Sequence, residues 1–175
     1  NRTSFIGREQ DMATLKALLL KQQLLTLWGP GGSGKTRLAV EIVKQIQPQF
    51  RHGVCFVDLS AVHDTALVKS EIAQRVGIKE VAGQSLEKTL ADYFHHRHGV
   101  LVLDNFEHVL AATPLILDLM NAAPLLHILV TSREPLLLYD EQQYEVVPLR
   151  LPDTTHCPPD WEDYRSLLCL DDATI

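Results

Sequence analysis

Short apolar runs alternate with longer amphipathic stretches along most of this chain. Residues 24–28, 54–59 and 100–104 are nearly continuous in apolar side chains, and residues 127–133 contain an apolar run that ends in polar residues. Such runs are typical of strands that are covered on both faces of a parallel sheet. Residues 144–147 predict a fifth strand.

The stretches between these runs carry apolar residues at three- and four-residue steps, as amphipathic helices do. The clearest helix is predicted over residues 36–46, and others carry apolar stripes within residues 12–19, 67–76, 86–94 and 115–120. Ser85 and Thr113 are expected N-caps, and Gly77 is expected to end a helix. Alternating strands and helices predict an α/β fold in which a parallel sheet lies between two helical layers. A length of 175 residues suits one such domain.

The first strand leads into Gly29-Pro30-Gly31-Gly32-Ser33-Gly34-Lys35-Thr36, which fits the phosphate-binding pattern G-x-x-x-x-G-K-[ST]. Glycines allow positive φ there and let backbone N–H groups approach phosphate oxygens. The helix that follows directs the positive end of its dipole toward the same phosphates. We expect Lys35 to reach the β- and γ-phosphates of ATP or ADP and the Thr36 hydroxyl to hold Mg²⁺. All eight residues and the adjacent Arg37 are candidate nucleotide-binding residues.

Two later strands end in side chains that suit the same site. The run over residues 100–104 ends in Asp104, a carboxylate that could hold Mg²⁺ across from Thr36. The run over residues 127–133 ends in Arg133, which could contact the γ-phosphate and report whether it is present. Ligands of open α/β sheets bind at the carboxyl ends of the strands, so the sequence predicts that both side chains lie in the nucleotide site.

The N-terminal residues suggest a contact with the nucleotide base, and the overall composition argues against nucleic-acid and membrane partners. Phe5 and Ile6 could pack against an adenine, or they could only pin the N-terminal arm to the core. A net charge of −6 argues against direct nucleic-acid binding by this segment. Three cysteines, an odd and sparse set, suggest reduced thiols and a cytoplasmic protein. The most apolar region, residues 109–130, is interrupted by Pro114 and Asp118, so no membrane span is expected.

The chain resembles the NB-ARC-type nucleotide-binding domain of STAND-class signalling ATPases, which occur in large bacterial regulators. The likeness spans residues 5 to about 150. Besides the phosphate-binding loop, it rests on Phe5-Ile6-Gly7-Arg8-Glu9, on Leu101-Val102-Leu103-Asp104-Asn105-Phe106-Glu107-His108 and on Thr131-Ser132-Arg133-Glu134-Pro135-Leu136.

The resemblance implies a P-loop NTPase with a five-stranded parallel sheet, in which the Arg133 strand lies between the loop strand and the Asp104 strand. It also implies an ADP-bound resting form, an ATP-bound active form, and a helical lid and winged-helix domain farther along the chain. We therefore expect a nucleotide-binding domain over residues 1–150 and a linker toward the missing lid over residues 151–175. The isolated domain is expected to be a monomer that binds nucleotide and no membrane.

One departure from the wider superfamily concerns hydrolysis. Many fast ATPases follow the magnesium aspartate with a glutamate that orients the attacking water, and this chain has Asn105 there. Asparagine can hydrogen-bond a water but is a very weak base, so slow ATP hydrolysis is expected. Glu107 is an alternative acid, although its spacing favours a side chain that faces away. An AAA+ initiator or loader ATPase and an ADP-stabilised scaffold without hydrolysis are the other functions considered.

Overall fold

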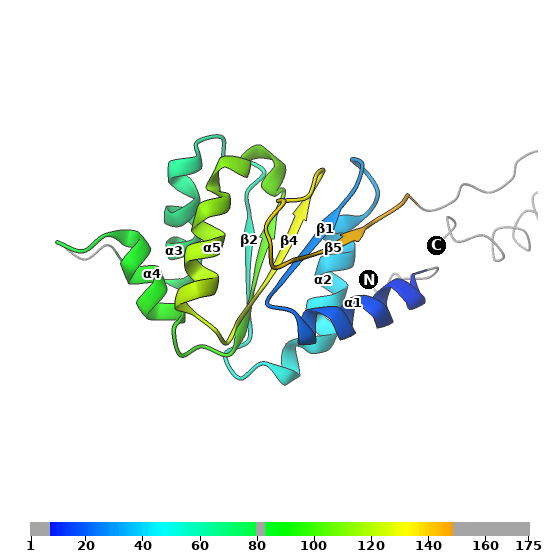
Figure 1. Cartoon of the computed structure of the whole chain (residues 1–175), viewed down its shortest axis with the longest axis horizontal. Coiled ribbons are helices and arrows are strands. Elements are labelled where there is room, and N and C mark those ends of the chain that lie inside the picture. The colour runs from blue at the N-terminus through cyan, green and yellow to red at the C-terminus, as the bar shows by residue number, and fades with distance from the viewer. Residues whose placement is uncertain (1–7, 80–82, 149–175) are drawn as a thin grey trace, which may run out of the picture.

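Five parallel strands form a single sheet (Figure 1). The computed structural model describes residues 8–79 and 83–148. The strands lie in the order β2-β3-β4-β1-β5, and every neighbouring pair is parallel. They are β1 (Leu24–Trp28), β2 (Val54–Asp58), β3 (Gly99–Asp104), β4 (Leu126–Ser132) and β5 (Glu141–Glu145). Because β4 lies between β1 and β3, the predicted strand order is confirmed, and the carboxyl ends of these three strands meet at one edge of the sheet.

Helices cover both faces of the sheet, so the predicted three-layer α/β architecture is confirmed (Figure 1). One layer contains α1 (Glu9–Lys21) and α2 (Lys35–Ile46), and the other contains α3 (Val68–Val76), α4 (Leu86–Phe94) and α5 (Thr113–Ala122). Short 3₁₀ turns connect them, of which η3 (Phe106–His108) follows β3 directly. No helix in the described part of the chain is long and apolar enough to cross a membrane.

The two faces of the sheet bury separate hydrophobic cores, because successive side chains of a strand point to opposite faces. In β3, Leu101 and Leu103 pack with the α3–α5 layer, whereas Val100 and Val102 pack with the α1–α2 layer. All residues of β3 are buried, including the terminal Asp104. Close packing on both faces fixes the end of this strand, and with it the turn that follows.

Several helix ends follow the sequence prediction. The Ser85 hydroxyl accepts a hydrogen bond from the Lys88 N–H at 3.3 Å and so caps α4, and Gly77 ends α3 with a φ of 74°. The prediction for Thr113 is wrong by one position. Thr113 is the first residue of α5 rather than its cap, because its hydroxyl donates to the Leu110 carbonyl of the preceding turn at 2.6 Å.

The two edge strands depart most from the predicted pattern. Val54, Cys55 and Phe56 of β2 are only half-buried, since no strand pairs with the outer edge of β2 within the described residues. The predicted covering on both faces is present but incomplete: Cys55 and Val57 pack with the core of the α3–α5 layer, and Val54 and Phe56 pack with that of the α1–α2 layer. The fifth strand occupies Glu141–Glu145 rather than residues 144–147. Among the described strands it pairs only with β1, and it carries mostly polar side chains, so the apolar pattern located only its end.

Candidate functional site

The loop between β1 and α2 has a backbone that only glycine adopts easily. Gly29, Gly32 and Gly34 have φ angles of 147°, 79° and 87°. Gly29 has a second constraint, because a Cβ at this position would lie 2.6 Å from the Val146 carbonyl oxygen. The close approach is held by the Val146 N–H, which donates to the Trp28 carbonyl at 2.7 Å. The glycines thus shape the loop and also let the chain beyond β5 pack against it.

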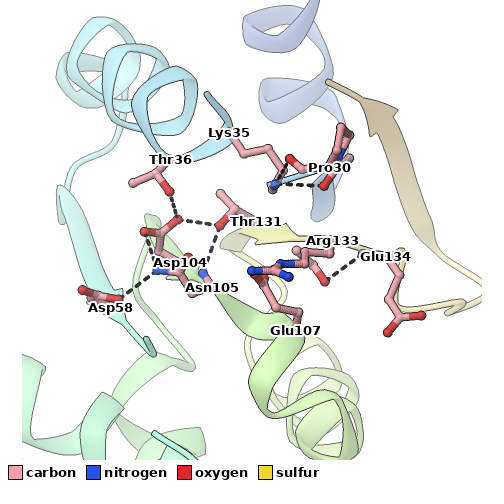
Figure 2. Close-up of polar contacts among 12 residues, drawn as sticks. Pro30, Lys35, Thr36, Asp58, Asp104, Asn105, Glu107, Thr131, Arg133 and Glu134 are labelled. Carbon is pink, nitrogen blue, oxygen red and sulfur yellow. Dashed lines mark hydrogen bonds and ion pairs between the residues drawn. The ribbon is translucent and has the colours of Figure 1, made fainter. Parts of the chain in front are cut away.

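Lys35 lies under this loop and is largely buried. Its Nζ donates to the Gly29 and Pro30 carbonyl oxygens, each at 2.9 Å (Figure 2). Burial lowers the pKa of Lys35, the nearby Glu107 carboxylate acts against this decrease, and the Arg133 guanidinium adds to it. The ammonium is therefore held at the mouth of the loop, within the electrostatic reach of both side chains.

Asp104 is the centre of a hydrogen-bond cluster at the carboxyl end of β3. Its Oδ1 accepts a hydrogen bond from the Thr36 hydroxyl at 2.8 Å and another from the Thr131 hydroxyl of β4. The side chain is only 2% exposed, so its position is set by these partners from α2 and β4. Figure 2 shows the Thr36 and Thr131 side chains pointing toward the same carboxylate. The predicted meeting of Thr36 and Asp104 is present in the structure.

Asn105 connects two strand ends through its side chain. Its Nδ2 donates to Asp58 Oδ1 at 3.0 Å and to Asp104 Oδ2 at 3.1 Å, and its backbone N–H donates to the Thr131 hydroxyl at 3.0 Å. The residue has a φ of 62°, a left-handed conformation that asparagine tolerates better than most residues. Its side-chain amide donates to two carboxylates, so this group connects the ends of β2 and β3 and holds the turn.

Arg133 follows β4 and turns toward the loop. Its Nε lies 3.2 Å from Glu107 Oε1, and its Nη2 would lie 4.0 Å from a Cβ at Gly31. The Arg133 side chain is 65% exposed and the Glu107 side chain 13%. Glu107 therefore faces the site, contrary to the expectation from its spacing, because the left-handed Asn105 and the 3₁₀ turn after it reverse the chain.

Comparison with known families agrees with this arrangement. The sequence profile described as "AAA domain" matches residues 19–148, which include the loop, Asp104 and Arg133. The chain belongs to the AAA domain family. Together with the parallel sheet and the loop geometry, this membership makes it an AAA-type P-loop ATPase domain.

Members with similar sequences belong to longer proteins. A Mycobacterium bovis protein named "Putative HTH-type transcriptional regulator" is 39% identical over 140 residues, which are 79% of this chain and 16% of that protein. Among solved structures, Cdc6p from Pyrobaculum aerophilum superposes with a TM-score of 0.60 at 15% identity, covering 81% of this chain and 46% of that one. A STAND protein with a tetratricopeptide repeat sensor from Pyrococcus horikoshii superposes with a TM-score of 0.55 at 14% identity, and the match covers 96% of this chain and 28% of that one. At such identities these two structures support the fold alone.

Arg8 precedes the residues that match the AAA family and was not selected as a site residue by the sequence prediction. It is 5% exposed and donates to the Ser33 carbonyl of the loop at 2.9 Å and to the Val147 carbonyl at 2.7 Å, while pairing with Asp11 at 3.0 Å. The arginine thus ties the start of α1 to the loop and to the chain after β5. The available signal was its place within residues 5–9, one of the segments on which the resemblance stated from the sequence rests.

Asp58 and Thr131 were missed as well, although both end apolar runs in the same way as Asp104 does. Asp58 is the register partner of Asp104 across the β2–β3 pair. Ser33 is buried in the loop and Arg37 is exposed in the first turn of α2. Phe5 and Ile6 lie outside the described residues, as do residues 151–175.

Proposed function

We propose that this chain is the ATP/ADP-binding switch domain of a larger signalling regulator of the STAND class. The observation that carries the proposal is the 2.8 Å contact between the Thr36 hydroxyl and the Asp104 carboxylate, directly beside Lys35. A glycine-rich loop, a cation and a pair of oxygen ligands at one sheet edge are the groups that bind a magnesium nucleotide.

The phosphates would be held by the loop. Gly29, Pro30, Gly31, Gly32, Ser33 and Gly34 supply backbone groups, Arg37 lies in the helix turn behind them, and Lys35 supplies the positive charge. In the structure the Lys35 ammonium is satisfied by the Gly29 and Pro30 carbonyls. A phosphate oxygen is a stronger, charged acceptor for the same ammonium. The loop therefore has its lysine already close to the place where the anion would bind.

The residues present also fit a magnesium ion. Mg²⁺ takes six oxygen ligands at about 2.1 Å in octahedral geometry, so two adjacent ligands lie about 3 Å apart. Thr36 Oγ1 and Asp104 Oδ1 are 2.8 Å apart. These two side chains would hold the ion, which when bound neutralises charge on the phosphates. Thr131 and Asn105 orient the carboxylate by donating to it.

Arg133 is proposed as the sensor of the γ-phosphate. Its guanidinium is exposed, adjoins the loop at Gly31 and is already paired with a carboxylate. A triphosphate would offer it a second anionic partner that a diphosphate lacks. A nucleotide shifts a conformational equilibrium only through its different affinities for the two conformations, and a contact that ATP makes and ADP lacks would supply such a difference. The long regulator in which the similar segment occupies 16% of the length supports a role within a larger assembly of domains.

Hydrolysis is proposed to be slow. The position after Asp104 is Asn105, whose side-chain amide is a very weak base and whose amide hydrogens donate to Asp58 and Asp104. A switch of this kind would turn over ATP below about 1 s⁻¹, the low end of ordinary enzymes.

Calorimetric titration of the chain with ADP, with and without Mg²⁺, tests the binding part of the proposal. We expect binding that strengthens with Mg²⁺. Single-turnover hydrolysis of labelled ATP tests the proposal that hydrolysis is slow. A well-folded chain that binds neither ATP nor ADP would overturn the proposed function.

An initiator or loader ATPase is a second candidate, because the fold superposes on that of Cdc6p. Such an assembly needs a nucleotide-dependent ring, which light scattering would detect, whereas the switch domain is expected to stay monomeric. Multiple turnover of ATP would separate both ATPases from an ADP-stabilised scaffold.

A further inference from the structure

A cavity of about 420 Å³ lies at the sheet edge opposite to the candidate nucleotide site. Gly53 and Val54 at the start of β2, and Gly99 and Val100 at the start of β3, line one side of it. The nucleotide site lies at the carboxyl ends of the same parallel strands, so the two sites are at opposite edges of the sheet. A volume in this range suits a small organic molecule, and the proposed switch does not account for it.

The other walls of the cavity are largely apolar. Val76, the last residue of α3, and Tyr93, near the end of α4, face Cys55 and Phe56 of β2 across it. All four side chains are only half-buried, because no strand covers the outer edge of β2 within the described residues. Apolar surface thus remains open between the strand and the ends of the two helices, where it could cover a flat apolar group.

Arg97 supplies a fixed positive charge at this cavity. Its guanidinium carbon lies 3.9 Å from the centre of the Tyr93 ring, a cation–π contact, and its backbone N–H donates to the Phe94 carbonyl at 2.9 Å. The guanidinium has no hydrogen-bond or ion-pair partner in the described part of the chain. A planar group that is held against a ring with free N–H donors is suited to binding an acid group.

Arg75 adds a second positive charge from α3. Its Nε donates to the Phe56 carbonyl at the open edge of β2 at 2.6 Å, and no acceptor among the described residues contacts its terminal nitrogens. Burial raises the pKa of the Cys55 thiol, and the Arg75 guanidinium acts against this increase. The charge of Arg75 is therefore felt at the strand that lines the cavity.

The charge of the cavity is the reverse of that of the whole chain. The chain carries a net charge of −6, yet no aspartate or glutamate is among the described residues that line the cavity, whereas Arg75 and Arg97 both are. Arginines that do not pair with carboxylates of their own protein leave their donors available to an anion from outside. Charge and apolar surface together define the chemistry of the ligand.

We propose that this cavity binds a small aromatic organic acid. The aromatic body would pack between the β2 side chains and Tyr93, the acid group would accept hydrogen bonds from Arg97, and Arg75 would add its charge to the same site. The site is separate from that of the nucleotide, so it stands or falls independently of the proposed switch function.

Two fluorescent probes with the same rings test the proposal. Anilinonaphthalene sulfonate has an aromatic body and one negative charge, and phenylnaphthylamine is the matched neutral probe because it lacks the sulfonate. The wild-type chain should bind the sulfonate saturably at a single site and the neutral probe at least about tenfold more weakly, since a charge-assisted contact is missing. Saturating Mg²⁺–ADP should not displace the sulfonate, because the nucleotide site lies at the other edge of the sheet.

Charge-removing variants identify the site. Arg97→Gln and Arg75→Gln should each bind the sulfonate about tenfold more weakly and the neutral probe as the wild type does. Arg97→Lys keeps the charge but loses the planar group and should lose less affinity than Arg97→Gln. Arg51→Gln is the matched control, because Arg51 is exposed just before β2 and does not line the cavity. Its affinity for both probes should equal that of the wild type.

Several outcomes would overturn the proposal. They are unchanged sulfonate affinity in folded Arg97→Gln and Arg75→Gln variants, displacement of the sulfonate by ADP, and absence of saturable sulfonate binding by the folded wild type. Circular dichroism checks that each variant is folded. The comparison of the two probes on the wild type needs no substitution, and equal affinities for them would exclude recognition of the acid group.

Discussion

The turns after β1 and β3 meet at one sheet edge but are built from different chemistry. The turn after β1 uses backbone groups, and its glycines adopt φ angles of 147°, 79° and 87°. The turn after β3 uses side chains: Asp104 and Asn105 bond to partners on β2, β4 and α2. The first turn presents N–H groups suited to an anion, and the second presents carboxylate oxygens suited to a cation or a proton.

This difference decides how each turn depends on the rest of the molecule. The conformation of the loop is local, although Arg8 and Val146 brace it from outside. The cluster around Asp104 exists only because three strand ends and one helix start converge. We therefore expect that replacing the glycines, which alters the allowed backbone conformations, damages the first turn. Removing polar side chains, which breaks hydrogen bonds, should damage the second.

Gly29→Ala is expected to have the largest effect. A Cβ would lie 2.6 Å from the Val146 carbonyl, and φ is positive. Positive φ costs about 1–2 kcal/mol and overpacking about 1–3 kcal/mol, so the free energy of unfolding should fall by about 2–5 kcal/mol. Urea denaturation without nucleotide measures it. Gly32→Ala is the matched control, since φ is also positive but no atom lies within 4 Å, and it should lose only about 1–2 kcal/mol. Equal losses in the two variants would contradict the role of the Val146 contact.

Lys35→Ala should weaken ADP binding at least about tenfold while the fold persists, because a charge-assisted contact is worth about 1.5–3 kcal/mol. Calorimetry measures the dissociation constant, and circular dichroism checks the fold. Lys44→Ala, which removes an exposed lysine of the same helix paired with Glu41, is the control and should bind ADP normally. Unchanged ADP affinity of a folded Lys35→Ala variant would remove the lysine from the site.

Asp104→Asn should weaken binding of Mg²⁺–nucleotide roughly tenfold and binding of metal-free nucleotide much less, because a carboxylate acts on the cation through hard oxygen ligation. Paired titrations with Mg²⁺ and with EDTA measure the difference. Asp118→Asn, at an exposed position of α5, removes the same charge and should change neither value. Equal losses with and without the metal would place Asp104 outside the magnesium site.

Asn105→Gly should have the smallest effect. The variant keeps the positive φ but loses the bonds to Asp58 and Asp104, so the free energy of unfolding should fall by about 1 kcal/mol. Asn105→Ala loses the same bonds and adds positive-φ strain, so its stability should be lower by about a further 1 kcal/mol. Chemical denaturation measures the free energy of unfolding of both variants. An alanine variant more stable than the glycine variant would contradict the expected positive-φ strain at this position.

The sequence was most informative where structure is local. Apolar runs located β1, β3 and β4 within about one residue, because buried central strands need apolar side chains throughout. It was least informative at the edges, where β5 is polar and β2 is half-exposed. Spacing also misjudged Glu107, since the direction of that side chain depends on a left-handed residue, and asparagine adopts this conformation only in some contexts.

The sequence by itself determined the phosphate-binding loop, because glycine spacing and one lysine specify a backbone shape without distant partners. It also located Asp104 at the end of one strand and Arg133 at the carboxyl end of another, directly after β4. Only the tertiary structure decided which side chains share the site. The pairing of β3 with β2 and β4 brings Asp58 and Thr131 to Asp104, and the turn after β3 brings Glu107 to Arg133. Contacts between residues so far apart in the chain follow from strand order and packing, which no local pattern contains.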